Sequence, residues 1–215
     1  MSSLRCTVAE ALVRFLCAQE GEDERPLCGG VFTIFGHGNV AGLGPALHKM
    51  QDELPVLRGH NEQGMAHAAT AYAKQNRRRR FMAVTTSIGP GATNLVTAAA
   101  PAHVNRLPLL LLPGDVFSNR GPDPVLQQLE DPRDAHASVN DCLRPVSRFF
   151  DRIDRSEHLA SALLRAMQVL MDPVNTGPVT LALPQDVQAE TIELPLSFLA
   201  RRTWRVRTPP PDASD

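Results

Sequence analysis

Cysteine, lysine, tryptophan and tyrosine are all scarce in this chain of 215 residues. The four cysteines form no C-x-x-C pair, which excludes a zinc knuckle, a redox dithiol and a disulfide-stapled mini-protein, so we expect buried, reduced thiols. The net charge is only −1, which disfavours a strongly basic nucleic-acid binder. The longest apolar run, residues 107–113, is too short to span a bilayer, and the N-terminus, MSSLRCTVAE, has no signal-type apolar core. We therefore expect a cytoplasmic protein.

What the chain does contain is typical of a globular domain, with 43% hydrophobic and 21% charged residues. Short β-branched or leucine-rich runs alternate with helical patterns, which indicates a parallel sheet covered on both faces. We predict an α/β fold with a doubly wound, mainly parallel six-stranded sheet. The expected strands are residues 31–35, 55–58, 81–85, 107–112, 145–150 and 178–183. We expect a first helix that begins at a capping box of Thr7 and Glu10, and a last helix that Ser156 caps. Between them, we expect helices over residues 45–51, 61–75 and 92–103.

The domain organisation is predicted from two changes in composition. Residues 114–142 are polar and contain prolines, so we predict a long excursion that carries function, with at most a short helix at 125–129. The last residues, RRTWRVRTPPPDASD, include three consecutive prolines, which favour an extended chain. We therefore expect one domain over residues 1–199 and a linker over residues 200–215 toward a missing central domain, with Trp204 docking onto that following domain.

Three strand-to-helix turns, residues 36–39, 59–64 and 86–94, contain unusual residues at positions suited to chemistry, because open α/β sheets bind ligands beyond the carboxyl ends of their strands. Glu62 follows one strand and has small neighbours, so its carboxyl is expected to be partly desolvated and suited to proton exchange with a bound heterocycle. The alternative is a first-turn acid that only interacts with the helix dipole. The loop Gly89-Pro90-Gly91 is either a ligand contact or a plain turn, and it lacks the spacing of a P-loop or a dinucleotide fingerprint.

These residues also resemble a known family. HNEQGMAHAATAYA and TTSIGPGATNLVTAAAPAHVNRLPLLLLPGD are similar to the pyrimidine-binding domain of the thiamine-diphosphate enzymes, the superfamily of acetohydroxyacid synthase, over about residues 7–194. Most members of that superfamily resemble T-S-G-P-G-A-T-N, whereas this chain has one more residue, Ile88. With that residue and NDCLRPVSRFFDRI, the chain resembles the subfamily of hydrolases that open an inositol-derived cyclic diketone.

The resemblance implies specific roles. Glu62 matches the glutamate that hydrogen-bonds the aminopyrimidine ring of thiamine diphosphate and, by sharing a proton with it, favours the imino tautomer that generates the ylid. His37 is implied as a proton carrier near the reacting carbon, although a turn histidine exposed to water is the plainer interpretation. Either Gln127 or Gln128 is implied to line the substrate channel. The implied cofactor-binding residues are Glu62, Gly38, Thr86, Pro90 and Asn94.

Half of a cofactor site is not found in the sequence. The family holds magnesium and the diphosphate with G-D-G and a later asparagine in another domain, and the only imitation here, Gly114-Asp115 with Asn140, lacks the second glycine. The resemblance therefore implies that a domain of another subunit supplies Mg²⁺, that the full enzyme is a homodimer or homotetramer, and that this chain alone is inactive. We predict no metal site made by this chain.

The sequence also bears on three other functions. The run Arg77 to Arg80 lies on the sheet edge opposite the predicted site, which argues against a nucleic-acid site. An acetolactate synthase-like carboligase or decarboxylase would keep Glu62 and the glycine loop, and only Ile88 and residues 123–131 argue against it. A non-catalytic, free-standing pyrimidine-binding subunit would expose apolar surface and associate with a partner.

Overall fold

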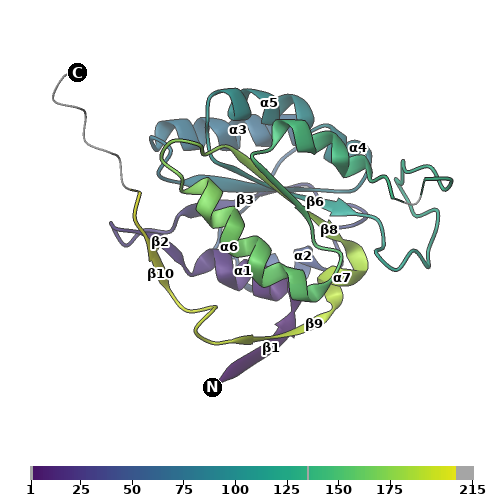
Figure 1. The fold of residues 1–215 in the computed structure, drawn as a ribbon, viewed down its shortest axis with the longest axis horizontal. Helices are drawn as coiled ribbons and strands as arrows, with labels where there is room; N and C mark the ends of the chain where they lie inside the picture. The colour runs from purple at the N-terminus through teal and green to yellow at the C-terminus, as the bar shows by residue number, and fades with distance from the viewer. Residues whose placement is uncertain (1, 135, 207–215) are drawn as a thin grey trace.

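A parallel sheet of six strands forms the centre of the computed structural model, which describes residues 2–134 and 136–206 (Figure 1). Its order is β4-β3-β5-β6-β8-β7, and every neighbouring pair runs parallel. The strands are β3 (Cys28–Thr33), β4 (Val56–Arg58), β5 (Phe81–Thr86), β6 (Leu109–Asp115), β7 (Phe149–Arg152) and β8 (Pro178–Pro184). The predicted doubly wound α/β fold is confirmed.

Helices cover both faces of this sheet (Figure 1). One layer contains α1 (Val8–Cys17), α2 (Leu43–Lys49), α6 (Leu159–Leu170) and the short α7 (Gln185–Ala189). The other contains α3 (Glu62–Gln75), α4 (Pro90–Thr93), α5 (Val96–Val104) and the 3-10 helix η1 (Val139–Val146). A second 3-10 helix, η2 (Ser156–His158), precedes α6.

The two faces have cores of different character, because successive side chains of a strand point to opposite sides. Leu110 and Leu112 of β6 join the larger cluster with α1 and α6, whereas Leu109 and Leu111 join the cluster below α3 and α5. The helices of the second cluster contribute mainly alanines, which let them approach the sheet closely. These buried alanines are Ala66, Ala69, Ala73, Ala98, Ala99 and Ala102.

The first helix begins as predicted. The Glu10 amide donates to the Thr7 hydroxyl at 3.1 Å, and the Thr7 amide donates to the Glu10 carboxylate at 3.4 Å. This capping box satisfies two amides that an α-helix leaves without partners at its start.

Residues 125–129, where we expect at most a short helix, form none, because Gln127 has a φ of 67°, which a right-handed helix does not allow. Two other local predictions were wrong. The predicted strand at 145–150 begins only at Phe149, since the 3-10 helix η1 runs to Val146. Ser156 does not cap α6; it is the first residue of η2, and His158 stands at the start of α6 without a side-chain cap bond.

Two small sheets, absent from the prediction, join distant parts of the chain. Strand β1 (Ser3–Thr7) pairs antiparallel with β9 (Thr191–Pro195), and β2 (Gln19–Gly21) pairs parallel with β10 (Arg202–Trp204). The indole Nε1 of Trp204 donates to the Gln19 Oε1 at 2.9 Å. Trp204 therefore packs on this domain, and residues 202–204 of the expected linker form a paired strand. Residues 207–215 of that linker lie outside the described residues.

Two further expectations concern the cysteine thiols and membrane-spanning helices. All four cysteines are free thiols; Cys6 and Cys28 are buried, and Cys17 and Cys142 are half-buried. Within residues 2–134 and 136–206, no helix has the length and apolar character needed to cross a bilayer.

Candidate functional site

The predicted site residues meet at the carboxyl ends of neighbouring strands. Strand β3 leads into residues 34–42, which we call the first loop, and β5 leads into residues 87–95, the glycine loop. Strand β6 leads into the excursion, which we predicted over residues 114–142 and which covers residues 116–138 in the structure. Since β3, β5 and β6 are adjacent and parallel, all three connections leave the same edge of the sheet, where such folds bind ligands.

Glu62 is the first residue of α3 and is half-buried at this edge. Asn61 before it caps the helix by accepting the Gly64 amide at 2.8 Å. The Asn94 Nδ2 donates to Glu62 Oε2 at 2.8 Å, so one carboxyl oxygen is held in place by the glycine loop. The other oxygen, Oε1, lies toward Gly91, where an added Cβ would be 3.5 Å away. Gly91 is buried, and the Ser87 hydroxyl fills the place that a side chain there would take.

The glycine loop is crowded at its own glycines. Gly89 has a φ of 60°, and a Cβ there would overlap the backbone oxygen of Gln127. A Cβ on Gly91 would overlap the Ser87 hydroxyl. Thr86 ends β5 fully buried and donates its hydroxyl to the Ser87 carbonyl at 3.0 Å, and Pro90 begins α4. Close packing therefore requires both glycines.

The first loop packs on the glycine loop through the additional residue Ile88. Gly38 has a φ of 95°, and a Cβ there would overlap the Ile88 side chain. The Ile88 amide donates to the His37 carbonyl at 3.0 Å, and the Ile88 side chain is buried. Ile88 thus fixes the position of His37 and Gly38 relative to the glycine loop.

The His37 imidazole is half-buried rather than fully exposed in its turn. Its Nε2 is enclosed and has no hydrogen-bond partner among residues 2–134 and 136–206. Its ring centroid is 6.3 Å from that of Phe117 in the excursion. Nε2 is therefore a buried polar atom whose hydrogen-bonding capacity the described residues leave unused.

The structure separates the two candidate glutamines. Gln127 Oε1 accepts the His37 amide at 3.3 Å, so this side chain reaches the first loop. Gln128 is turned into its own segment, where its amide donates to Asp123 at 2.7 Å and its Oε1 accepts the Val125 amide at 2.9 Å. Gln127 lies at the candidate site and Gln128 does not.

Sequence reasoning missed two side chains that hold the first loop. Asn39 is buried; its Oδ1 accepts the Gly36 amide at 2.9 Å and its Nδ2 donates to the Thr85 hydroxyl at 3.2 Å. Gln188 of α7 donates to the Gly38 carbonyl and accepts the Leu43 amide at 3.0 Å. An asparagine in a glycine-rich turn is a recognisable signal, whereas Gln188 stands 150 residues from Gly38 and has no signal in a single sequence.

Asp115, which resembles part of a metal-binding motif, has its carboxylate engaged by other side chains of the chain. It is buried, and it accepts the Arg152 Nε at 2.7 Å and the Ser138 hydroxyl at 3.2 Å. Burial raises the pKa of Asp115, and the Arg152 guanidinium opposes that rise. Asn140 donates to the Gly114 carbonyl at 3.0 Å. The described residues contain no group of three His, Cys, Asp or Glu side chains that could hold a metal.

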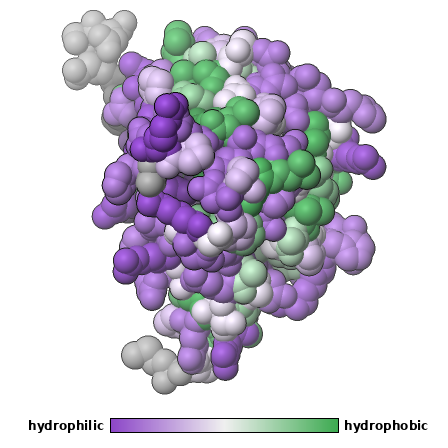
Figure 2. Space-filling model, turned by 90° about the vertical axis from the view of Figure 1, so that its right-hand side faces the viewer, coloured by the Kyte–Doolittle hydropathy of each residue, from purple (hydrophilic) through white to green (hydrophobic). Residues whose placement is uncertain are grey.

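Further contacts anchor the excursion at both ends. Asp186 of α7 accepts the Ser118 amide at 2.8 Å and the Asn119 amide at 2.9 Å. At the other end, Glu130 accepts the Val139 amide at 2.9 Å. Figure 2 views the molecule from the side where the excursion lies in Figure 1, and hydrophobic patches interrupt its hydrophilic surface. Exposed hydrophobic side chains of these connections are Phe35, Val40, Leu126 and Leu129.

The fold and this edge, with a carboxyl group beside a glycine loop, define a doubly wound α/β domain of the kind that binds ligands beyond the carboxyl ends of its strands. Residues 7–135 match the family model described as thiamine pyrophosphate enzyme, N-terminal TPP binding domain. The match covers more than half of the chain, and the chain belongs to this family.

Two curated relatives with the same name are similar to this chain over almost its whole length. The chain is 55% identical over 210 residues to the 3D-(3,5/4)-trihydroxycyclohexane-1,2-dione hydrolase of Geobacillus thermodenitrificans (strain NG80-2), which covers 96% of this chain and 33% of the relative. It is 53% identical over 213 residues to the protein of the same name from Clostridium botulinum (strain Alaska E43 / Type E3), covering 97% of this chain and 33% of that relative. The chain thus spans about a third of the length of these relatives.

Proposed function

We propose that this chain is the N-terminal, pyrimidine-binding part of a thiamine-diphosphate-dependent hydrolase that opens the ring of trihydroxycyclohexane-1,2-dione to 5-deoxyglucuronate in myo-inositol catabolism. The identity of 55% to a hydrolase of that name, over 96% of this chain, supports the substrate. The single structural observation that carries the proposal is the Glu62 carboxyl, held by Asn94 at 2.8 Å beside the glycine loop.

The residues at this edge suit the aminopyrimidine of thiamine diphosphate. Asn94 engages Oε2 of Glu62, so Oε1 is the carboxyl oxygen that would bond to the ring. Glu62, Gly91 and Asn94 would hold the ring, with Gly38, Thr86 and Pro90 shaping the surrounding loops. When bound, the cofactor would supply the nucleophilic carbon for the reaction with the diketone.

The chain's own residues then move protons and shape the site. Glu62 exchanges a proton with the ring nitrogen through Oε1, while Asn94 keeps Oε2 in place. His37 carries a proton at Nε2, the nitrogen left without a described protein partner. Gln127 borders the substrate because it bridges the excursion and the first loop.

The remaining half of the site is proposed to come from another subunit of a homodimer or homotetramer. A diphosphate-binding domain there would hold Mg²⁺, for which the described residues provide no cluster of ligands. The exposed hydrophobic side chains near the site, of which Leu126 is 73% exposed, support a surface that a partner domain covers.

The test is turnover of the diketone by the native protein from its own cells, supplied with thiamine diphosphate and Mg²⁺, with Glu62 replaced by Gln. We expect Glu62→Gln to lower kcat/KM by about a hundredfold or more, since an amide cannot exchange this proton. Glu157→Gln, at an exposed position in η2, is the matched control and should retain activity. Circular dichroism checks that both variants fold.

Three results would contradict the proposal. Activity of Glu62→Gln near that of the control would remove the proton-exchange role. Turnover of pyruvate but not of the diketone would identify a carboligase or decarboxylase instead. A native polypeptide near 23.4 kDa that is inactive without a separate protein would identify a free-standing subunit.

A further inference from the structure

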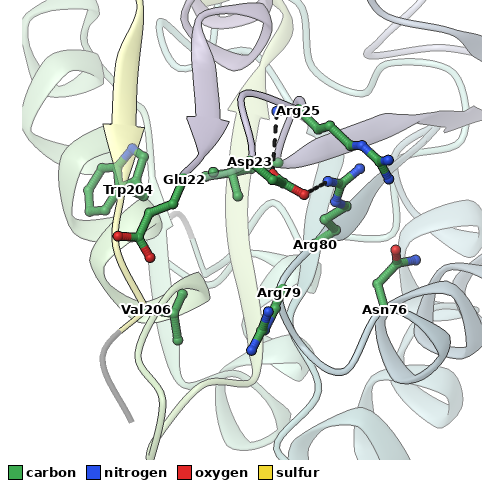
Figure 3. A pocket seen from close by; sticks show the side chains of 10 residues that line it. Glu22, Asp23, Arg25, Asn76, Arg79, Arg80, Trp204 and Val206 are labelled. Carbon is green, nitrogen blue, oxygen red and sulfur yellow. Dashed lines mark hydrogen bonds and ion pairs between the residues drawn. The ribbon is translucent and has the colours of Figure 1, made fainter.

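A second cavity lies at the opposite edge of the sheet, where the strands begin. It has a volume of about 310 Å³ and lies between the β2–β10 pair and the turn that joins α3 to β5 (Figure 3). The side chains that matter for its chemistry are Asp23, Arg25, Asn76, Arg79, Arg80 and Trp204. Asn76 follows the last residue of α3, whereas Glu62 is the first, so the length of this helix, about 20 Å, separates the cavity from the candidate cofactor site.

Positive charge exceeds negative charge in this cavity. Arg80 is paired with Asp23 at 2.5 Å, and the Arg205 Nε lies 3.4 Å from the Glu22 carboxylate, so both acids are compensated. Arg25 and Arg79 are exposed and have no carboxylate partner in residues 2–134 and 136–206. Two guanidinium groups are therefore left to attract an anion.

The opposite wall is aromatic. Trp204 stands on the other side of the cavity from Arg80 and Asn76 (Figure 3). Its Nε1 is fixed by Gln19 at 2.9 Å, and Gln19 is itself buried and bonded to the Phe15 carbonyl at 2.6 Å. The ring is thus held in one orientation before any ligand arrives, which lowers the entropy cost of binding.

We propose that this cavity binds a small organic phosphate with a planar ring, of the size of a mononucleotide. The cations of the cavity are arginines, whose planar forks match phosphate oxygens in pairs. The Trp204 wall suits a flat ring, and Asn76 adds an amide that can donate or accept. A volume of about 310 Å³ lies at the lower end of the range for small-molecule sites.

The experiment uses the fluorescence of Trp204, which is the single tryptophan of the 215-residue chain. AMP, inorganic pyrophosphate and adenosine are titrated separately, and calorimetry gives an independent affinity. We expect saturable binding of AMP with a change in tryptophan emission, weaker binding of pyrophosphate, and the weakest binding of adenosine, which has no anion. Raising the salt concentration should weaken AMP binding, because exposed charges are screened.

Substitutions of the cavity's arginines test whether AMP binds in this cavity. Arg79→Gln and Arg25→Gln should each weaken AMP by about tenfold, the loss of one charge-assisted contact. Arg165→Gln, at an exposed position in α6, is the matched control and should leave the affinity unchanged. Glu62→Gln should also bind AMP normally, which separates this cavity from the candidate cofactor site. Absence of saturable AMP binding, or an unchanged affinity in Arg79→Gln, would overturn the proposal.

Discussion

Burial controls the reactivity of the cysteine thiols. It raises the pKa of Cys17 from 9.0 to about 11 and that of Cys28 to about 12, and it also raises the pKa values of Cys6 and Cys142. At pH 8 we therefore expect the folded protein to react slowly with a disulfide reagent and the urea-unfolded chain to react fully. The reaction of Cys17 should accelerate as the pH rises toward 11.

The same shift links stability to alkaline pH. The folded-state pKa of Cys17 is raised, so its neutral thiol contributes stability that is present below pH 9 and lost as the pH rises toward 11. Urea unfolding at pH 8 and pH 10 measures this, and Cys17→Ser supplies the comparison. Equal loss of stability in the wild type and in Cys17→Ser would exclude Cys17 as the cause.

At the residue scale, the sequence predicted which residues lie at the carboxyl edge of the sheet, but not which hydrogen bonds they make there. Glu62 and Asn94 were expected separately at the ligand edge, and both lie there because each follows the carboxyl end of a strand. The hydrogen bond between them at 2.8 Å depends on how α3 and the glycine loop are placed in space, which no local pattern encodes. The choice between Gln127 and Gln128 depended likewise on the backbone of the excursion.

At the scale of elements, the glycine loop and the excursion are fitted to each other. In Gly89→Ala the new Cβ would overlap the Gln127 backbone at a φ of 60°, so we expect the excursion to be displaced and the stability to fall by about 1–3 kcal/mol. Limited proteolysis within residues 116–138 should become faster. Urea unfolding measures the loss of stability.

Gly64→Ala is the matched control for that variant. Gly64 lies in α3, where a Cβ would meet only the Asn61 side chain at 3.6 Å, and alanine favours the helix. We expect Gly64→Ala to be neutral or slightly stabilising, with unchanged proteolysis of the excursion. Equal cleavage rates in Gly89→Ala and Gly64→Ala would show that the excursion does not depend on this contact.

Elements with a strong periodic pattern were predicted well, and those governed by single backbone angles were not. The capping box of α1 and the alanine-rich α3 have local causes, so both were expected close to their observed bounds. At residues 125–129 the side chains allowed a short helix, whereas the structure gives Gln127 a positive φ and brings its side chain to the first loop. A window of sequence does not contain that contact.

For the whole molecule, strand β10 is expected to contribute to stability, unlike a linker. Trp204 packs against the larger core cluster and donates to Gln19, so we expect Trp204→Ala to lower the free energy of unfolding by about 2 kcal/mol. Val104→Ala, where the valine is 77% exposed, should change it by less than about 0.5 kcal/mol. Urea titration followed by circular dichroism measures both, and equal stabilities would mean that β10 is dispensable.

At the scale of the whole molecule, the six-stranded central sheet could be predicted from the sequence, whereas the two small sheets could not. Six hydrophobic strands alternating with helices leave few arrangements other than a doubly wound sheet. Strands β2 and β10 have three residues each and pair across more than 180 positions, so neither shows a period-2 pattern or a nearby turn. The same distance hid the docking of Trp204 onto its own domain.

Ile88 lies just beyond the last paired residues of β5, since Thr85 and Thr86 are already in register with Leu112 and Pro113 of β6. A residue gained or lost at this point changes how the first loop is seated without shifting any strand of the sheet. The seat of the first loop is therefore set by a side chain outside the hydrogen-bonded ladder, so a substitution at position 88 would alter the loop and leave the strand pairing intact.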